Sequence, residues 1–276
     1  MAFNDNAVFT ASTGFLYIAE VGTAAPTPKQ LSSFDPETFG AHQYTLKTTG
    51  SGEYTLTVGS DSTDPIKADA SAPEVQAALQ QLKGVGVGNV VAEGTDPKQG
   101  YTISFVGDSF GKTVDLKGGA GATVTEFAKP LGWTPIGHTS NEDLPEFGYD
   151  GGDSETKGSW QKKVLREITS EAPVDYITVN ALQFDEQTLE LYYGKNASKQ
   201  ANVFGVDAPG AEGVEKAFLL VMKDGLFKIA FSAAKASVRR EESISLENDD
   251  FAALPLRATF VKHPGRHLYE WTLPEE

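Results

Sequence analysis

The chain has 276 residues, enough for one large domain or two smaller ones. It contains no cysteine, which excludes disulfide bonds, a thiolate nucleophile and any metal site built on cysteine. Its 38 acidic residues outnumber the 23 basic ones and give a formal net charge of −15, the opposite of what phosphate binding to nucleic acid requires. We expect no export signal and no transmembrane helix, because no basic start with an apolar stretch behind it and no long apolar run occurs.

Short runs of β-branched and aromatic residues, bounded by Gly, Asp, Ser or Pro, dominate the chain and predict a mainly β protein. Strands are expected at residues 14–21, 54–58, 101–106, 164–168, 174–182, 215–222, 226–232, 235–242, 254–262 and 267–273. Asp224 and Gly225 lie between two apolar arms, which predicts an antiparallel hairpin with a two-residue type I′ turn.

Two helices are predicted. The first covers residues 72–83, with Ser71 and Glu74 as a capping box and Gly84 as a left-handed stop. The second covers residues 186–193 and is short, with Asp185 as its cap and Gly194 at its end.

Residues 40–126 differ in composition from the rest of the chain. Gly, Thr, Ser and Ala dominate this block, strands flank its predicted helix, and all three tryptophans lie after it. We therefore expect a small α+β domain at 40–126, inserted into a larger β domain formed by residues 1–39 and 127–276. About 87 residues are enough for an independent core. The alternative is that these strands extend one large sandwich.

No catalytic constellation emerges, and we predict a protein that is not an enzyme and has no cofactor or metal. Residues 107–113 are similar to a phosphate-binding loop, but three residues separate the glycines where the motif needs four. Pro264 and Gly265 separate His263 from His267, which excludes a helix presenting both to a metal. A metal pair in a loop remains the alternative to two exposed histidines. An active site built from scattered residues also stays open.

Four segments outside the 40–126 block carry a resemblance to a known family. They are residues 14–26 (GFLYIAEVGTAAP), 131–140 (LGWTPIGHTS), 150–160 (DGGDSETKGSW) and 183–194 (QFDEQTLELYYG). In this order they resemble the major tail proteins of bacteriophages with long non-contractile tails, especially phages of actinobacteria. The block itself departs from the family's minimal pattern and looks like the extra modules that such phages carry on tail and capsid proteins.

The resemblance implies two antiparallel sheets with one short helix, in a sandwich that joins others into a barrel. Six copies would form a ring, and stacked rings would form the tail tube, the conduit for genome delivery. The implied partners are further copies of the chain, a tape measure protein inside the tube, and tail terminator and distal tail proteins at its ends. Phage DNA would pass through without specific binding, and no membrane is involved. Assembly would take place in the host cytoplasm, and the protein would reside in the virion tail.

Residues 144–160 form the candidate subunit interface. Their glycines and acids cannot bury enough apolar surface to order the segment alone, whereas the aromatic residues within it suit interface anchors. We expect the segment to be disordered or mobile in the free subunit and ordered in the tube, with a plain surface hairpin as the alternative. The expected interface residues are Phe147, Tyr149, Asp150, Asp153, Glu155 and Trp160.

A different class of protein also fits the composition. A surface-displayed β-rich protein that binds carbohydrate or mediates adhesion would account for repeated strands and exposed aromatic residues. The missing export signal argues against it, unless the chain is exported as part of a particle.

Overall fold

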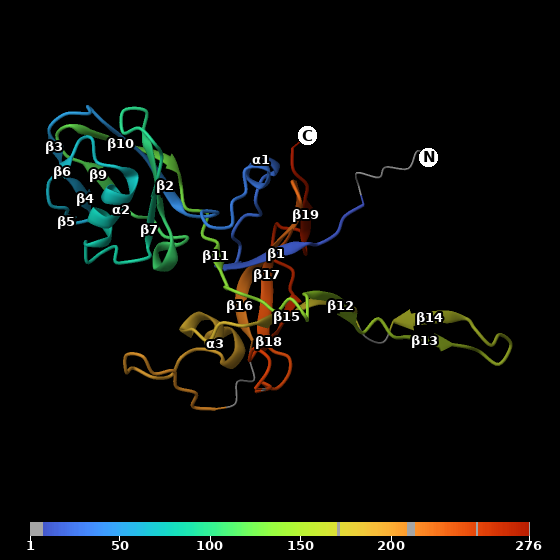
Figure 1. The fold of residues 1–276 in the computed structure, drawn as a ribbon. Helices are drawn as coiled ribbons and strands as arrows, with labels where there is room; N and C mark the ends of the chain where they lie inside the picture. Colours follow the sequence, from blue (N-terminus) through green and yellow to red (C-terminus); the bar gives the residue numbers. More distant parts are fainter. Residues whose placement is uncertain (1–7, 170–171, 209–212, 247, 276) are drawn as a thin grey trace. The chain divides into compact units, whose positions relative to one another are not determined.

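The computed structural model describes residues 8–169, 172–208, 213–246 and 248–275. Contacts within the chain divide it into two compact units (Figure 1). One unit is Ser33–Thr134, the 33–134 unit, and the other combines Met1–Ser32 with Pro135–Glu276, the sheet unit. Strands are far more numerous than helices, which confirms the predicted mainly β class.

An eight-stranded sheet forms the centre of the sheet unit. Its hydrogen-bonded order is β11 (Thr134–Pro135), β1 (Thr13–Ala19), β16 (Val214–Asp224), β17 (Phe227–Arg240), β18 (Leu254–Phe260), β15 (Val174–Ala181) and β12 (Glu146–Asp150), with β19 (Glu270–Thr272) beside this path on β17. The pairings from β1 through to β12 are antiparallel. The predicted antiparallel architecture is therefore confirmed.

Burial along the strands shows where the core of this unit lies. In β18 every second residue is buried, as in a strand with one covered face. In β16 the five consecutive residues 217–221 are buried, which indicates cover on both faces. The same core cluster contains Leu191 and Tyr192 from α3 (Glu186–Tyr193), a helix that packs against β17 and β18.

Helix α3 has the predicted boundaries and the predicted cap. The backbone N–H of Thr188 donates to Asp185 Oδ1 at 2.8 Å, and Gly194 ends the helix at φ +90°. A second helix of this unit, α1 (Pro28–Ser32), was not predicted, because five residues are too few to show a helical hydrophobic period. None of the helices in the described residues is long and apolar enough to cross a membrane.

The turn between β16 and β17 differs from its prediction by one residue. Asp224 pairs with Phe227, so the two turn residues are Gly225 and Leu226. Gly225 has a φ of +59°, whereas Leu226 is outside the left-handed region. This is the φ pattern of a type II′ turn, in which glycine takes the first central position, and the type I′ prediction is wrong.

Strand β17 is also longer than predicted. The expected strands at 226–232 and 235–242 form one continuous strand of 14 residues. The register with β16 shifts between Lys216 and Phe218, and this bulge absorbs one residue without interrupting the pairing.

The 33–134 unit has its own core and a mixed α+β structure. Its four-stranded sheet has the order β10 (Ala122–Ala128), β2 (His42–Thr48), β8 (Tyr101–Phe105) and β7 (Val90–Glu93), and α2 (Ala72–Gln80) packs against β7. Two small sheets complete it: β5 (Asp61–Ser62), β4 (Leu56–Val58) and β9 (Leu116–Gly118), and the pair β3 (Glu53–Tyr54) and β6 (Ile66–Lys67). Most of its buried side chains form one cluster that includes Leu46, Leu56, Leu79, Ile103 and Phe105, and a smaller cluster contains Phe110.

Helix α2 begins as predicted but ends earlier. The backbone N–H and the hydroxyl of Ser71 both donate to Glu74 Oε2 at 2.7 Å, which confirms the glutamate arm of the capping box. After the helix, Leu82 N–H donates to the carbonyl of Leu79 in a tighter turn. Gly84 is not in the left-handed region, so its predicted role as the helix stop is wrong.

Candidate subunit interface

Strand β12 is an edge of the eight-stranded sheet. It pairs with β15 on one side, and no strand in the described residues pairs with its other side. The backbone N–H and C=O groups on that outer side are available to another chain, as on any open sheet edge. Three of the predicted interface residues, Phe147, Tyr149 and Asp150, lie on this strand.

Phe147 packs within its own subunit. Its ring centroid lies 4.8 Å from that of Phe231, at an interplanar angle of 72°, and 5.6 Å from that of Trp271. Phe231 is buried, whereas 41% of Phe147 stays exposed. Phe147 is thus the outer member of an aromatic cluster, and its remaining surface is open to a partner.

Gly148 allows an aromatic ring to lie across the edge strand. It pairs with Tyr176 in the β12–β15 register, and a Cβ at position 148 would come within 2.5 Å of the tyrosine ring. On the same ring, the guanidinium carbon of Arg257 lies 3.5 Å from the ring centroid. This is a cation–π stack, and a larger residue at position 148 would displace it.

Arg257 connects β12 to the rest of the sheet. Its guanidinium forms an ion pair with Asp150 and a second one, at 3.2 Å, with Glu241. Burial by itself would lower the pKa of Arg257, but the hydrogen bonds and charges of the two carboxylates outweigh it and raise that pKa. Asp150, predicted at the interface, is therefore engaged within its own chain.

After β12 the chain forms a two-stranded hairpin of β13 (Ser154–Lys157) and β14 (Arg166–Thr169). In the described residues these strands pair only with each other, and every residue from 154 to 169 is exposed. Lys157 Nζ lies 2.6 Å from Glu155 Oε2, an exposed ion pair that contributes little to stability. Asp153 is exposed in the connection that precedes β13. The segment expected to be disordered or mobile, 144–160, thus contains the strands β12 and β13, and its mobility in the free subunit stays a prediction.

Two of the predicted anchors are open to solvent. Tyr149 is 73% exposed, and Trp160, between β13 and β14, is 99% exposed. The hairpin exposes three further apolar side chains that the sequence analysis had placed only in a strand: Val164, Leu165 and Ile168. So many exposed apolar side chains on a short segment are typical of a surface that a partner covers.

Comparison with known proteins decides the family. The family model described as "Phage tail tube protein" matches residues 1–85 and 113–276. The chain belongs to the phage tail tube protein family. It is a structural subunit of a tail tube, as the resemblance predicted, and neither this family nor the relatives below support the carbohydrate-binding alternative.

Two relatives align along nearly the whole chain. They are the "Major tail protein Gp23" of Mycobacterium phage D29 and that of Mycobacterium phage L5, each 37% identical over 271 residues, which is 98% of this chain and 93% of each relative. The predicted likeness to major tail proteins of actinobacterial phages is therefore confirmed. A solved structure from Mycobacterium phage Patience aligns with 49% of this chain and 48% of its own at 17% identity, but its TM-score of 0.28 is too low to support a conclusion.

Proposed function

We propose that six copies of the chain close into a ring, and that stacked rings form the tube through which the phage genome passes. The family match over residues 1–85 and 113–276 carries this proposal. The open outer edge of β12 supports it, because a closed ring of sheets would cover that edge. The exposed hairpin β13–β14 supports it as a second surface that needs a partner.

Within this assembly the predicted interface residues take different parts. Tyr149 and Trp160 contact neighbouring copies, since they are the most exposed of the large apolar residues in the segment. Phe147 and Asp150 hold β12 in the position for that contact, through the aromatic cluster and Arg257. Asp153, in the β12–β13 connection, and Glu155, in β13, lie at the margin of the subunit interface.

We also propose that the tail-tube domain is interrupted by an inserted α+β domain. The separate core of the 33–134 unit supports this division. The unit extends beyond the expected 40–126 block on both sides and includes the buried Phe34, Phe39 and Trp133. Since the relatives align over 98% of the chain, we expect them to share this domain. It would lie on the outside of the tube, because the lumen must stay open.

The remaining partners follow from the same assembly. A tape measure protein would lie in the lumen, a tail terminator at one end and distal tail proteins at the other. The subunit would be made in the host cytoplasm, would reside in the virion tail and would have no catalytic role. At a net charge of −15 per copy, the wall would not retain passing DNA.

Electron microscopy of the purified protein tests the assembly. We expect rings or tubes from the full chain, and a protein that stays monomeric at high concentration contradicts the proposal. A variant in which a short Gly-Ser linker between Ser33 and Thr134 replaces the intervening residues should still form tubes. Joining Phe39 to Phe127 is the matched control, and it should fold less well because it exposes Phe34 and Trp133. Loss of tubes in the first variant would place the 33–134 unit at the subunit interface.

A further inference from the structure

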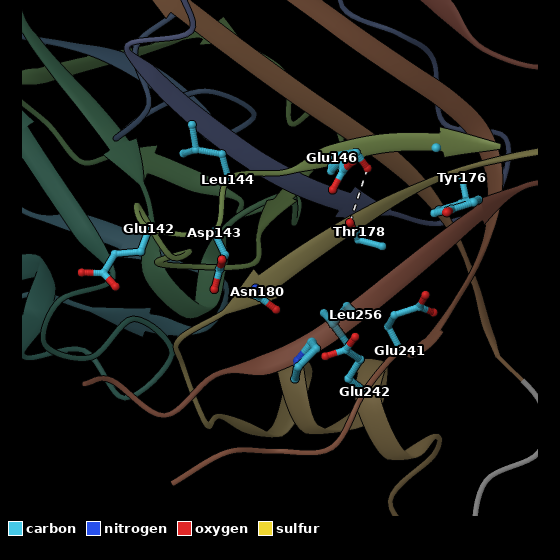
Figure 2. Close-up of a pocket in the computed structure, with 12 residues that line it drawn as sticks. Glu142, Asp143, Leu144, Glu146, Tyr176, Thr178, Asn180, Glu241, Glu242 and Leu256 are labelled. Atoms are coloured by element: carbon cyan, nitrogen blue, oxygen red, sulfur yellow. Dashed lines mark hydrogen bonds between the residues drawn. The ribbon is translucent and has the colours of Figure 1, made fainter. Parts of the chain in front are cut away.

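An acidic groove lies on the sheet unit next to the candidate interface. It has a volume of about 570 Å³ and runs over β15, between the segment at 142–146 and the residue pair 241–242 (Figure 2). Apolar surface from Leu144, Pro255 and Leu256 lines part of it. Its acidic residues are Glu142, Asp143, Glu146, Glu241 and Glu242.

The charge of this groove is largely uncompensated. Glu241 pairs with Arg257, whereas the other four acids form no ion pair within the described residues. Carboxylates that line one small groove repel one another. A cationic side chain from outside the subunit would relieve this repulsion, so the groove favours a basic occupant.

The β13–β14 hairpin has the opposite charge. Residues 154–169 contain four cations and two acids, a net +2 in a chain whose net charge is −15. Of these cations, Lys157 pairs with Glu155, whereas Lys162, Lys163 and Arg166 form no ion pair within the described residues. The turn of the hairpin thus presents two adjacent lysines close to the fully exposed indole of Trp160.

The two surfaces do not satisfy each other within one subunit. Every residue from 154 to 169 is exposed, and the four groove acids without an ion pair are exposed as well. A hairpin seated in the groove of its own chain would bury both. Two surfaces of opposite charge that remain open in one copy are complementary between copies.

We propose that the hairpin tip of one copy docks into the acidic groove of the next. Lys162 and Lys163 pair with the groove acids, and the indole of Trp160 packs on the apolar lining. The aromatic contact adds to the affinity, and the charges select the surface and the register. Each copy has one tip and one groove, so the contact is directional and propagates from copy to copy. The inference rests on the proposed function, which supplies the neighbouring copy.

Charge reversal on each surface tests the docking. The tip variant carries Lys162→Glu and Lys163→Glu, and the groove variant carries Glu142→Lys, Asp143→Lys and Glu242→Lys, which makes the groove net positive. Each should raise the concentration needed for tube formation about tenfold, because like charges then face each other. A control with Lys195→Glu and Lys199→Glu makes the same change of charge as the tip variant, at exposed positions outside both surfaces, and should assemble normally.

Rescue separates lost docking from lost folding. An equimolar mixture of the tip and groove variants should form tubes at the wild-type concentration, because each tip then meets a groove of opposite charge. The chain with all five substitutions should recover in the same way. Tip and groove variants that assemble like wild type, or variants that fail alone and also fail when mixed, overturn the docking. If wild-type protein forms no rings or tubes, the proposed function fails and the docking fails with it.

Discussion

The 33–134 unit and the β13–β14 hairpin show two ways in which one chain holds a local structure. The unit buries Leu46, Leu56, Leu79 and Phe105 completely, and its sheets close around them. The hairpin buries none of its residues between 154 and 169, and two paired strands alone are marginally stable in water. The core of the 33–134 unit therefore stabilises that unit's own fold. The exposed side chains of the hairpin are instead expected to stabilise contacts between copies.

A truncation in each region tests this contrast. Phe105 is fully buried and packs edge-to-face against Tyr44, with ring centroids 6.2 Å apart. Phe105→Ala should lower the free energy of unfolding of the 33–134 unit by about 3–5 kcal/mol, measured by denaturant unfolding. Trp160→Ala removes a larger side chain but should change monomer stability by less than about 0.5 kcal/mol. Comparable losses in both variants would show that the hairpin packs on the fold.

The same contrast explains what could be read from the sequence. Local patterns gave correct results where neighbours in sequence decide the structure, as in the Asp185 cap of α3. They misplaced the turn at Gly225, because the dipeptides Asp-Gly and Gly-Leu both suit tight turns and only the cross-strand pairing of Asp224 selects between them.

For the interface, exposure was predictable and internal contacts were not. The glycines and acids around Tyr149 indicate a segment without its own core, and the structure leaves this side chain exposed. Asp150, however, pairs with Arg257, which is 107 residues away along the chain. No local pattern contains such a contact. The sequence did offer one signal. Apolar residues alternate along β18, and this alternation places Arg257 on the face opposite Leu256, although it does not name Asp150 as the partner.

A smaller effect is expected inside the 33–134 unit, at Tyr54. Its hydroxyl is buried and has no hydrogen-bond partner among the residues that the structure describes, and burial raises the pKa of Tyr54 to about 12. Tyr54→Phe removes the unsatisfied hydroxyl and should raise the free energy of unfolding at neutral pH by about 1 kcal/mol. Tyr101→Phe is the matched control and should have the opposite sign, because the hydroxyl of Tyr101 donates to the carbonyl of Ala70 at 2.9 Å.

The raised pKa of Tyr54 also predicts how the stability of the wild-type protein depends on pH. The folded-state pKa of Tyr54 lies above the unfolded value of about 10. The neutral phenol therefore adds no pH dependence below pH 10, and the folded state loses stability as the pH rises from 10 towards 12, since the unfolded chain ionises first. Wild-type protein should lose more stability than Tyr54→Phe over this range, measured by denaturant unfolding at each pH. Parallel losses would show that Tyr54 is already ionised or hydrated in the fold.

The smallest effect on the isolated fold is expected at Tyr149, which is 73% exposed. Tyr149→Ala should change monomer stability by less than about 0.5 kcal/mol, yet it should slow assembly, measured by light scattering. Phe147→Ala is the control on the same strand. It should reduce both monomer stability and assembly, because Phe147 packs against Phe231 and Trp271. A Tyr149→Ala variant that assembles at the wild-type rate would remove this side chain from the interface.

Hydrogen exchange tests whether the backbone of β12 and of the β13–β14 hairpin is also ordered by contacts between copies. In the monomer, β12 amides that bond to β15 should be partly protected, whereas those at 151–158 should exchange rapidly, since the hairpin has only its own two strands for support. On polymerisation the amides at 151–158 should become protected, along with the outer edge of β12. Equal exchange in monomer and tube would make β13–β14 a plain surface hairpin. Protection confined to β12 would show that ring closure uses the sheet edge alone, because a docked hairpin cannot leave its amides exchanging freely.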